Sequence, residues 1–224
     1  MIRLVCKATL LAALGVMIAG AVMAGVPNAA QSNLNGSILQ LGGSAAGVVD
    51  VRCEKQILVR DAALNPVANS VVIINFATCA LSEIRLSTTQ PHPGLTVNCA
   101  ARTVSATTNA SGIAVFRVLG GSNVLASADA GAADGCASVT ADGVPLGNLS
   151  VATADMNAAN VGGAGVTGTD TVLFTGNRFG GPALYRPRAN FAGVVGSIDG
   201  VDTVQFTGYR FGGGSSANGA TFCP

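Results

Sequence analysis

The sequence predicts a mainly β fold, a β-sandwich followed by a small duplicated unit of loop and helix. Charged residues make up only 10% of the chain, while Gly, Ala, Ser, Thr, Val and Asn dominate, a mixture that fits turn-rich β structure better than a helical bundle. Short apolar runs bounded by Gly, Pro, Asn and Asp follow one another through the first two thirds of the chain. The last third contains an internal repeat.

Residues 1–24 have the layout of a secretory signal peptide. Two basic residues precede an uncharged apolar run over residues 8–23, and Ala24 ends a motif of small residues typical of a cleavage site. The run of about 16 residues is shorter than the roughly 20 that a membrane-spanning helix needs. The sequence therefore predicts cleavage after Ala24, a mature chain that does not span the membrane and is secreted or held at the cell surface, and a linker over residues 25–35.

The mature chain is close to electrical neutrality, with ten basic residues against eleven acidic ones. A neutral surface gives no electrostatic reason to expect nucleic acid as a partner. Export to an oxidising compartment favours disulfides, and because the mature chain has an odd number of cysteines at least one thiol stays outside intrachain bonds. The pair Cys79–Cys99 is preferred, since it would clip the loop between two predicted strands. The candidate cysteines are Cys53, Cys79, Cys99, Cys136 and Cys223.

Residues 36–152 are predicted to form the β-sandwich. Asp142-Gly143 is a strong hairpin signal, because both central positions of such a turn favour positive φ. Strand candidates in close succession, with no convincing helix between them, are typical of a sandwich. The predicted strands are residues 37–41, 56–60, 70–76, 95–99, 102–106, 113–118, 123–127, 137–141 and 149–152.

Two segments of this region resemble bacterial Ig-like domains of the invasin/intimin kind. Residues 58–72 resemble the strand, Asp-x-x-Gly-x-Pro-Val turn and second strand that open such domains, with Leu64 where the family prefers Gly. Residues 107–116 resemble the Thr-Asp-x-x-Gly-x-Ala turn and strand, with Asn109 in place of Asp. The resemblance implies an Ig-like sandwich and says little about activity, since one fold hosts many functions.

A duplication organises residues 153–214, before a tail over residues 215–224. The segment 170–181 recurs as 202–213 with ten of twelve positions identical. As helices, the two segments would begin at Asp170 and Asp202, where a carboxylate accepts backbone hydrogen bonds and faces the positive end of the helix dipole. As strands, Val-x-Phe would alternate and Thr-Gly would turn a hairpin. The helical interpretation is preferred.

The loop before each segment resembles the dockerin repeat, half of an EF-hand. The resemblance implies calcium ligands at Asp155, Asn157 and Asp170 in the first copy and at Asn190, Asp199 and Asp202 in the second. Asp155 and Asp170 are 15 residues apart, more than in a regular loop, and Arg188 takes the first ligand position if Asn190 is kept as a ligand. We therefore expect no required cofactor and calcium only as an optional ligand.

In dockerins the duplicated helices contact the partner. The resemblance thus implies a protein partner, cohesin-like or a component of the cell envelope, bound through Leu173, Arg178, Gln205 and Arg210. The repeated arginines are also expected to cover aromatic rings.

Catalytic motifs are sparse, and the sequence predicts a non-enzymatic protein. His92 is the only histidine and lies between two prolines, Glu54 and Glu83 are the only glutamates, and neither Gly-x-Ser-x-Gly nor a phosphate loop occurs. The predicted role is protein–protein interaction or structural assembly outside the cell. The alternative is an extracellular carbohydrate-binding or adhesin module with a polysaccharide partner, which would gain support if Tyr185, Tyr209 and an arginine lay coplanar on one exposed face.

Overall fold

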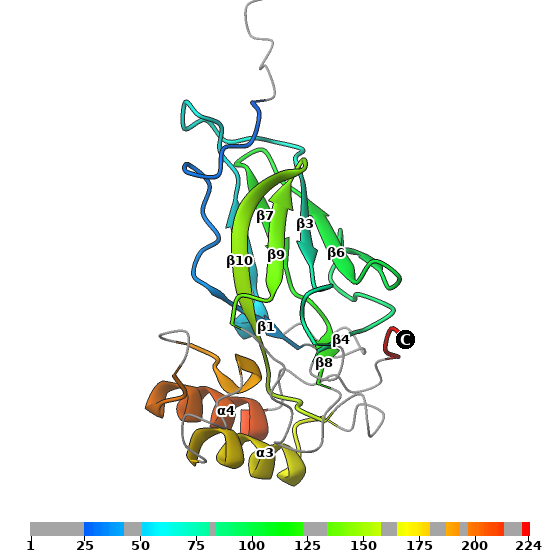
Figure 1. Cartoon of the computed structure of the whole chain (residues 1–224), viewed down its shortest axis with the longest axis vertical. Helices are drawn as coiled ribbons and strands as arrows, with labels where there is room; N and C mark the ends of the chain where they lie inside the picture. The colour runs from blue at the N-terminus through cyan, green and yellow to red at the C-terminus, as the bar shows by residue number, and fades with distance from the viewer. Residues whose placement is uncertain are drawn as a thin grey trace, which may run out of the picture.

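The computed structural model describes residues 25–42, 51–80, 84–122, 134–157, 165–179, 187–192, 197–212 and 221–224. The predicted signal peptide and the strand predicted at 123–127 lie outside these residues. Within them the chain is mainly β, with a curled sheet and two α-helices that lie together at one end of it (Figure 1). In the described part of the chain, no helix is long and apolar enough to cross a membrane.

Six strands form the main sheet in the order β1-β10-β9-β3-β6-β5. β1 pairs with β10 in parallel, and every other pair in this sheet is antiparallel. The strands are β1 (Ile38–Leu41), β3 (Val71–Asn75), β5 (Thr96–Asn98), β6 (Thr103–Thr107), β9 (Ala137–Ala141) and β10 (Val144–Thr153).

Two further strand pairs complete the β part. β2 (Lys55–Leu58) pairs with β7 (Ile113–Phe116), and β4 (Arg85–Leu86) pairs with β8 (Gly120–Gly121). Alternate residues of β3 and β7, such as Ile74 and Phe116, are fully buried and belong to one hydrophobic core. This period of two is the pattern expected of strands that bury one face. Two short 3-10 helices, η1 (Val51–Cys53) and η3 (Pro187–Ala189), lie outside the sheets.

The hairpin predicted at Asp142-Gly143 connects β9 to β10. Both residues have positive φ, 47° and 82°, as the sequence pattern requires. The Asp142 carboxylate also accepts a hydrogen bond from the Val71 N–H at 2.8 Å, which ties the turn to β3. Leu64 is another positive-φ residue, at 69°, which explains why the Ig-like pattern has glycine there.

The predicted strands match the described ones closely, with three differences. β10 begins at Val144 rather than residue 149, because the chain pairs with β9 directly after the turn. β4 and β8 were not predicted. Each has two residues, too few for an alternating pattern to show.

The predicted disulfide Cys79–Cys99 is wrong. Cys79 bonds Cys136 and Cys99 bonds Cys223, with Cα–Cα distances of 4.8 and 5.2 Å. Because β3 pairs with β9, the chain just after β3 lies beside the chain just before β9, and this brings the first two cysteines together. Cys53 is buried and takes part in neither disulfide.

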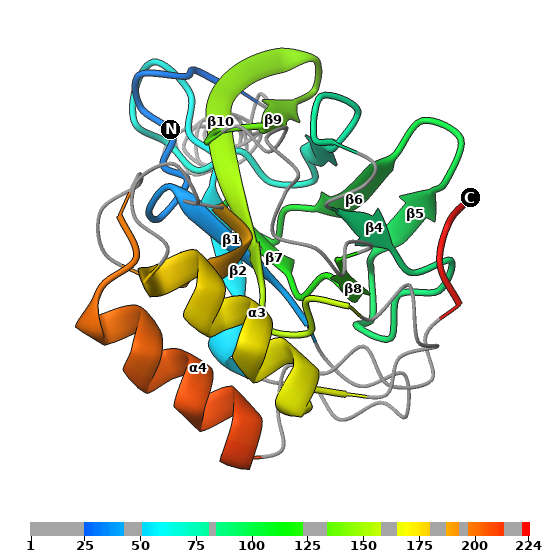
Figure 2. The same ribbon diagram turned by 60° about the horizontal axis from the view of Figure 1, so that its bottom comes forward.

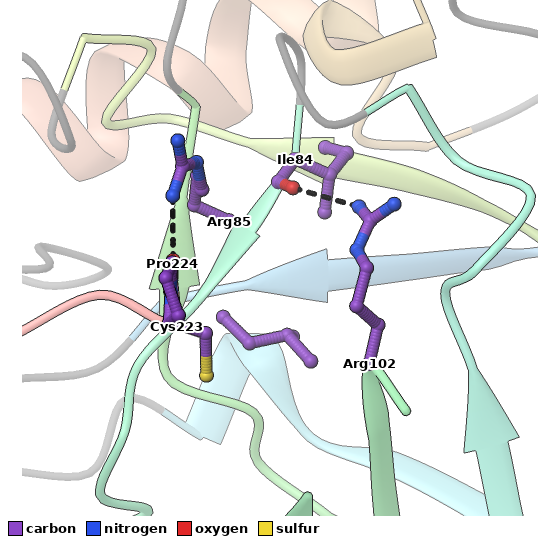
Figure 3. Close-up of a pocket in the computed structure, with 6 residues that line it drawn as sticks. Ile84, Arg85, Arg102, Cys223 and Pro224 are labelled. Carbon is purple, nitrogen blue, oxygen red and sulfur yellow. Dashed lines mark hydrogen bonds between the residues drawn. The ribbon is translucent and has the colours of Figure 1, made fainter. Parts of the chain in front are cut away.

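The C-terminal residues return to the β part, where a tail was predicted. The Cys223 N–H donates to the Leu86 carbonyl at 2.8 Å, and the Thr88 N–H donates to the Thr221 carbonyl at 2.7 Å. Arg85 Nη1 donates to the Cys223 carbonyl at 2.6 Å (Figure 3). The segment therefore lies along β4, held by backbone bonds, by an arginine and by a disulfide.

Candidate functional site: the paired helices

The duplicated segments form α3 (Gly168–Phe179) and α4 (Gly200–Gly212), which lie side by side (Figure 2). Each has a fully buried aspartate in its first turn, Asp170 in α3 and Asp202 in α4. Asp170 Oδ1 accepts a hydrogen bond from the Met156 N–H at 2.6 Å, and Oδ2 accepts bonds from the Thr167 N–H and hydroxyl at 2.7 and 3.0 Å. The helical interpretation of the repeat is thus confirmed. Each helix begins two residues before its aspartate rather than at it, and the carboxylate accepts backbone N–H groups at the N-terminal end, as predicted.

Asp202 repeats this arrangement in the second copy. Its Oδ1 accepts hydrogen bonds from the Phe191 and Ala192 N–H groups at 2.7 and 3.0 Å, and its Oδ2 accepts one from the Asp199 N–H at 2.7 Å. Each carboxylate therefore caps its own helix and holds the segment upstream of it. Since Phe191 corresponds to Met156, the residue before it, Asn190, occupies the position of Asp155.

The structure brings some of the expected calcium ligands together and gives others a different role. Asp155, Asn157 and Asn190 are buried, while Asp199 is exposed and accepts a bond from the Val201 N–H at 2.7 Å. Asn157 Oδ1 is buried and accepts no hydrogen bond, as an oxygen kept for a cation would be. Among the described residues, however, no three His, Cys, Asp or Glu side chains gather at one point.

Calcium takes six to eight oxygen ligands, mostly carboxylate and carbonyl oxygens. The Asp170 and Asp202 carboxylates, which would close the two loops, have both oxygens engaged by backbone N–H groups. These bonds satisfy the negative charge without a metal ion. Neither capping carboxylate therefore keeps an oxygen without a protein donor.

Equivalent residues of the two repeats meet between the helices. The Phe174 and Phe206 rings stack with centroids 4.4 Å apart and planes 1° apart. Phe191 packs 6.0 and 6.3 Å from these rings, and Tyr209 meets Phe191 edge-on at 5.5 Å. Such aromatic pairs add about 0.5–1.5 kcal/mol each beyond the burial of their surface. Leu173 belongs to the same core and is 7% exposed.

Contacts with β1 and η1 fix the helix pair against the β part. Gln40 on β1 donates from Nε2 to the Phe191 carbonyl at 2.7 Å and to Gln205 Oε1 at 3.1 Å, and it accepts a hydrogen bond from the Tyr209 hydroxyl. The Arg52 guanidinium lies 4.6 Å from the centroid of the Tyr209 ring. The orientation of the helices is therefore set by polar contacts and by a cation–π contact.

Large apolar side chains lie exposed on the side of the helices away from this core. Five of the eight exposed large hydrophobic residues of the described chain are on α3 and α4. They are Val172 (71% exposed), Phe179 (72%), Val201 (51%), Val204 (72%) and Phe211 (80%). We call this surface the outer face.

A groove of about 150 Å³ opens between the two helices, and both repeats line it with the same residue types. Each copy contributes two threonines and two phenylalanines. They are Thr171, Phe174, Thr175 and Phe179 from α3, and Thr203, Phe206, Thr207 and Phe211 from α4, with Arg210 beside them. The groove is therefore apolar at its base, with hydroxyl groups along its sides.

The arginines behave as predicted. The Arg178 guanidinium lies 4.9 Å from the Phe179 centroid and the Arg210 guanidinium lies 5.3 Å from the Phe211 centroid, so both cover aromatic rings. Leu173 was expected on a partner surface and is instead buried in the aromatic core. Gln205 was expected there too, and its side-chain oxygen is bonded to Gln40.

The exposed residues Val172, Phe179, Val204 and Phe211 were not predicted as partner residues. Their spacing of seven within each helix already placed each pair on one helical face, and that pattern is the signal from which they could have been found. The arrangement that would favour sugar binding is absent from the described residues. Tyr209 is 2% exposed, and Tyr185 lies outside the described part of the chain.

Two other hollows lie in the β part of the described chain. A shallow hollow of about 260 Å³ lies beside His92, and burial lowers the pKa of that imidazole. Near it, Glu54 and Arg117 form an ion pair with an N–O distance of 2.5 Å. The other, lined by Arg85 and Arg102, has only about 10 Å³, room for about one water molecule (Figure 3).

Comparisons with known proteins identify no family for this chain and a weak structural similarity. No family model matches the chain, and no curated protein matches it. Among solved structures, the adhesin InvE of Yersinia pseudotuberculosis is 17% identical, covering 58% of this chain and 29% of the adhesin, with a TM-score of 0.21. The chain therefore spans less than a third of that adhesin, and a likeness of this strength carries no argument about function.

Proposed function

We propose that this chain is an exported, non-enzymatic interaction module. An Ig-like β domain holds a dockerin-like helix pair, and the outer face of that pair binds a protein partner outside the cell or at its surface. Calcium is not required for this binding. The two disulfides support the export part of the proposal, since such bonds persist in oxidising compartments.

The exposure of the outer face is the observation that carries the proposal. Burying one Val or Phe side chain contributes about 1.5–3 kcal/mol, and this face leaves several such side chains in water side by side. Elsewhere in the described chain the exposed apolar residues Val26, Leu64 and Val71 lie apart from the helices. Clustered apolar exposure of this kind marks an interaction surface.

The anchoring of the helices supports the same role. Gln40, Tyr209 and Arg52 join α4 to the β part, so the outer face is presented in one orientation. A surface held rigidly before binding loses less conformational entropy when a partner covers it.

Site-specific photo-cross-linking tests the proposal. A photoreactive amino acid at Val172 in the secreted full-length chain should give a defined adduct, while one at Leu64, 53% exposed on a turn of the β part, should not. The adduct should disappear when Phe179 and Phe211 are both replaced by serine. We expect that double substitution to weaken binding of the purified partner at least about tenfold in calorimetry. Equal adducts from both positions, or an adduct that survives the serines, would exclude the outer face.

A further inference from the structure

We infer that the groove between α3 and α4 takes one phenyl ring of the protein partner, and that Arg210 binds a carboxylate beside that ring. This inference rests on the proposed function, because the groove is continuous with the outer face, and it goes further by naming what the partner inserts. Phe179 and Phe211 belong to both surfaces, so a protein that covers the outer face also reaches the groove.

The size and the lining of the groove favour a single aromatic ring. Its volume is about 150 Å³, and an apolar cavity of about that volume in another protein takes up benzene. Phe174 and Phe206 line the groove, and their rings stack with centroids 4.4 Å apart. A third ring that enters therefore meets aromatic surface, and aromatic pairs are stabilised beyond the burial of their area. We expect the inserted side chain to be a phenylalanine of the partner.

The charge of the groove favours an acidic neighbour for that phenylalanine. Among the described residues that line the groove, Arg210 is the charged one, and it is partly exposed. Its guanidinium lies over the Phe211 ring and makes no hydrogen bond or ion pair within the described part of the chain. The planar guanidinium carries five N–H donors in a geometry that matches a carboxylate. A carboxylate beside the inserted ring would thus meet a two-pronged donor, whereas a lysine would meet a like charge.

The first repeat supplies a matched control. Arg178 holds the position in α3 that Arg210 holds in α4, and it is also partly exposed. Its guanidinium lies 4.9 Å from the centroid of the next phenylalanine, against 5.3 Å for Arg210. Arg178 does not belong to the lining of the groove. The two arginines therefore share residue type, exposure class and aromatic contact, and they differ in whether they line the groove.

NMR titration of the oxidised chain with short capped peptides tests the inference. Acetyl-Gly-Asp-Phe-Gly-amide should shift the amide signals of α3 and α4 with a dissociation constant on the order of 1 mM. The same peptide with asparagine for aspartate should bind about tenfold more weakly, because it lacks the charge that pairs with the guanidinium. With alanine for phenylalanine, binding should not be detected at about 20 mM.

Variants of the two arginines assign the carboxylate contact. Arg210→Gln should lower the affinity for the aspartate peptide about tenfold and leave that for the asparagine peptide unchanged, while Arg178→Gln should change neither. Arg210→Glu should instead prefer the peptide with lysine in place of aspartate. That reversal needs an intact groove, so it separates a lost contact from a lost fold, and circular dichroism checks the helices of each variant.

Equal binding of the aspartate and asparagine peptides to the native chain would overturn the inference. So would equal losses in Arg210→Gln and Arg178→Gln, or a preference that Arg210→Glu does not reverse. If no peptide binds at about 20 mM, a concentration well above the expected dissociation constant, the inference also fails. In that case the proposed function still stands when the cross-linker at Val172 gives an adduct that the serine substitutions at Phe179 and Phe211 remove.

Discussion

Replacing Asp202 by asparagine tests whether the capping carboxylates hold the helix pair together. Asp202 is fully buried and accepts three backbone N–H groups, two on Oδ1 and one on Oδ2. An asparagine of the same size keeps one acceptor oxygen for the Phe191 and Ala192 N–H groups. Its NH₂ group then faces the Asp199 N–H, so that a buried donor meets a donor.

The expected loss follows from these bonds. A hydrogen bond to a charged acceptor contributes about 1.5–3 kcal/mol, so Asp202→Asn should lower the free energy of unfolding by about 2 kcal/mol. Asp202→Ala removes all three bonds and should cost about 3–5 kcal/mol, since each buried N–H group left without an acceptor costs about 1–3 kcal/mol. Thr207→Ala on the same helix serves as the control, because an exposed substitution should change the stability by no more than about 0.5 kcal/mol.

Urea unfolding of the oxidised full-length chain, followed by far-ultraviolet circular dichroism, measures these differences. The experiment should be run in EDTA and repeated with calcium. We expect the same loss in both, because the carboxylate acts on backbone N–H groups. A variant as stable as the native chain would refute the capping argument. A loss seen only when calcium is present would assign the carboxylate to a metal site instead.

Three further predictions follow from single contacts. Lys55 is buried with Nζ bonded to three backbone carbonyls, and burial lowers its pKa to about 8. The unfolded chain therefore binds more protons than the folded chain between about pH 8 and the ordinary lysine pKa, so the free energy of unfolding should rise with pH across that window. Urea unfolding of the native chain and of Lys55→Met measures this effect as a difference between the two. A difference that does not change with pH would contradict the prediction. Replacing Cys99 and Cys223 by serine should cost about 2–4 kcal/mol of unfolding free energy in the same assay, and peptide mapping without reductant should recover this pair in the native chain. Gly112→Ala should lower the melting temperature more than Gly143→Ala. Both glycines have positive φ, but only at Gly112 would a Cβ lie 2.5 Å from a backbone carbonyl oxygen. Equal losses of melting temperature would contradict the steric argument.

Local signals in the sequence were sufficient for much of the β part. The Asp142-Gly143 turn needs only its own two residues to be recognised, and the alternation in β3 predicts which side chains, such as Val72 and Ile74, are buried. The duplication likewise predicted two helices with equivalent aspartates at their N-terminal ends, although each helix begins two residues earlier than predicted. In each case the pattern and its consequence lie within a dozen residues of each other.

Pairings between distant segments could not be predicted in this way. The disulfide Cys79–Cys136 depends on β3 lying beside β9, and the disulfide Cys99–Cys223 depends on the C-terminal segment returning to β4. The helices raise a second difficulty, because Val172 and Phe174 are both apolar and only the fold determines that the phenylalanine is buried. The duplication predicted the helix pair, and the choice between its inner and outer stripes required the structure.

The two positions at which the repeats differ account for the different contacts that the two helices make. Ten positions are identical, and these supply the capping aspartate, the stacked phenylalanines and the exposed Val172, Phe179, Val204 and Phe211. The differing positions hold Leu173 and Asn177 in α3 but Gln205 and Tyr209 in α4. Both α4 residues bond Gln40, whereas Asn177 donates within its own helix to the Leu173 carbonyl at 2.7 Å.

Divergence within the twelve repeated positions is therefore concentrated where α4 meets the β part, while an exposed valine and phenylalanine occur at equivalent positions of both copies. If the helices served only to cover the end of the sheet, nothing in the described contacts would require exposed valine and phenylalanine at equivalent positions of both. The proposed interaction surface would account for them, and the two phenylalanines, Phe179 and Phe211, also line the groove between the helices. Exchanging Gln205 and Tyr209 for the α3 residues should loosen α4 from β1 and leave the stack of Phe174 on Phe206 in place, since neither exchanged side chain belongs to that ring pair.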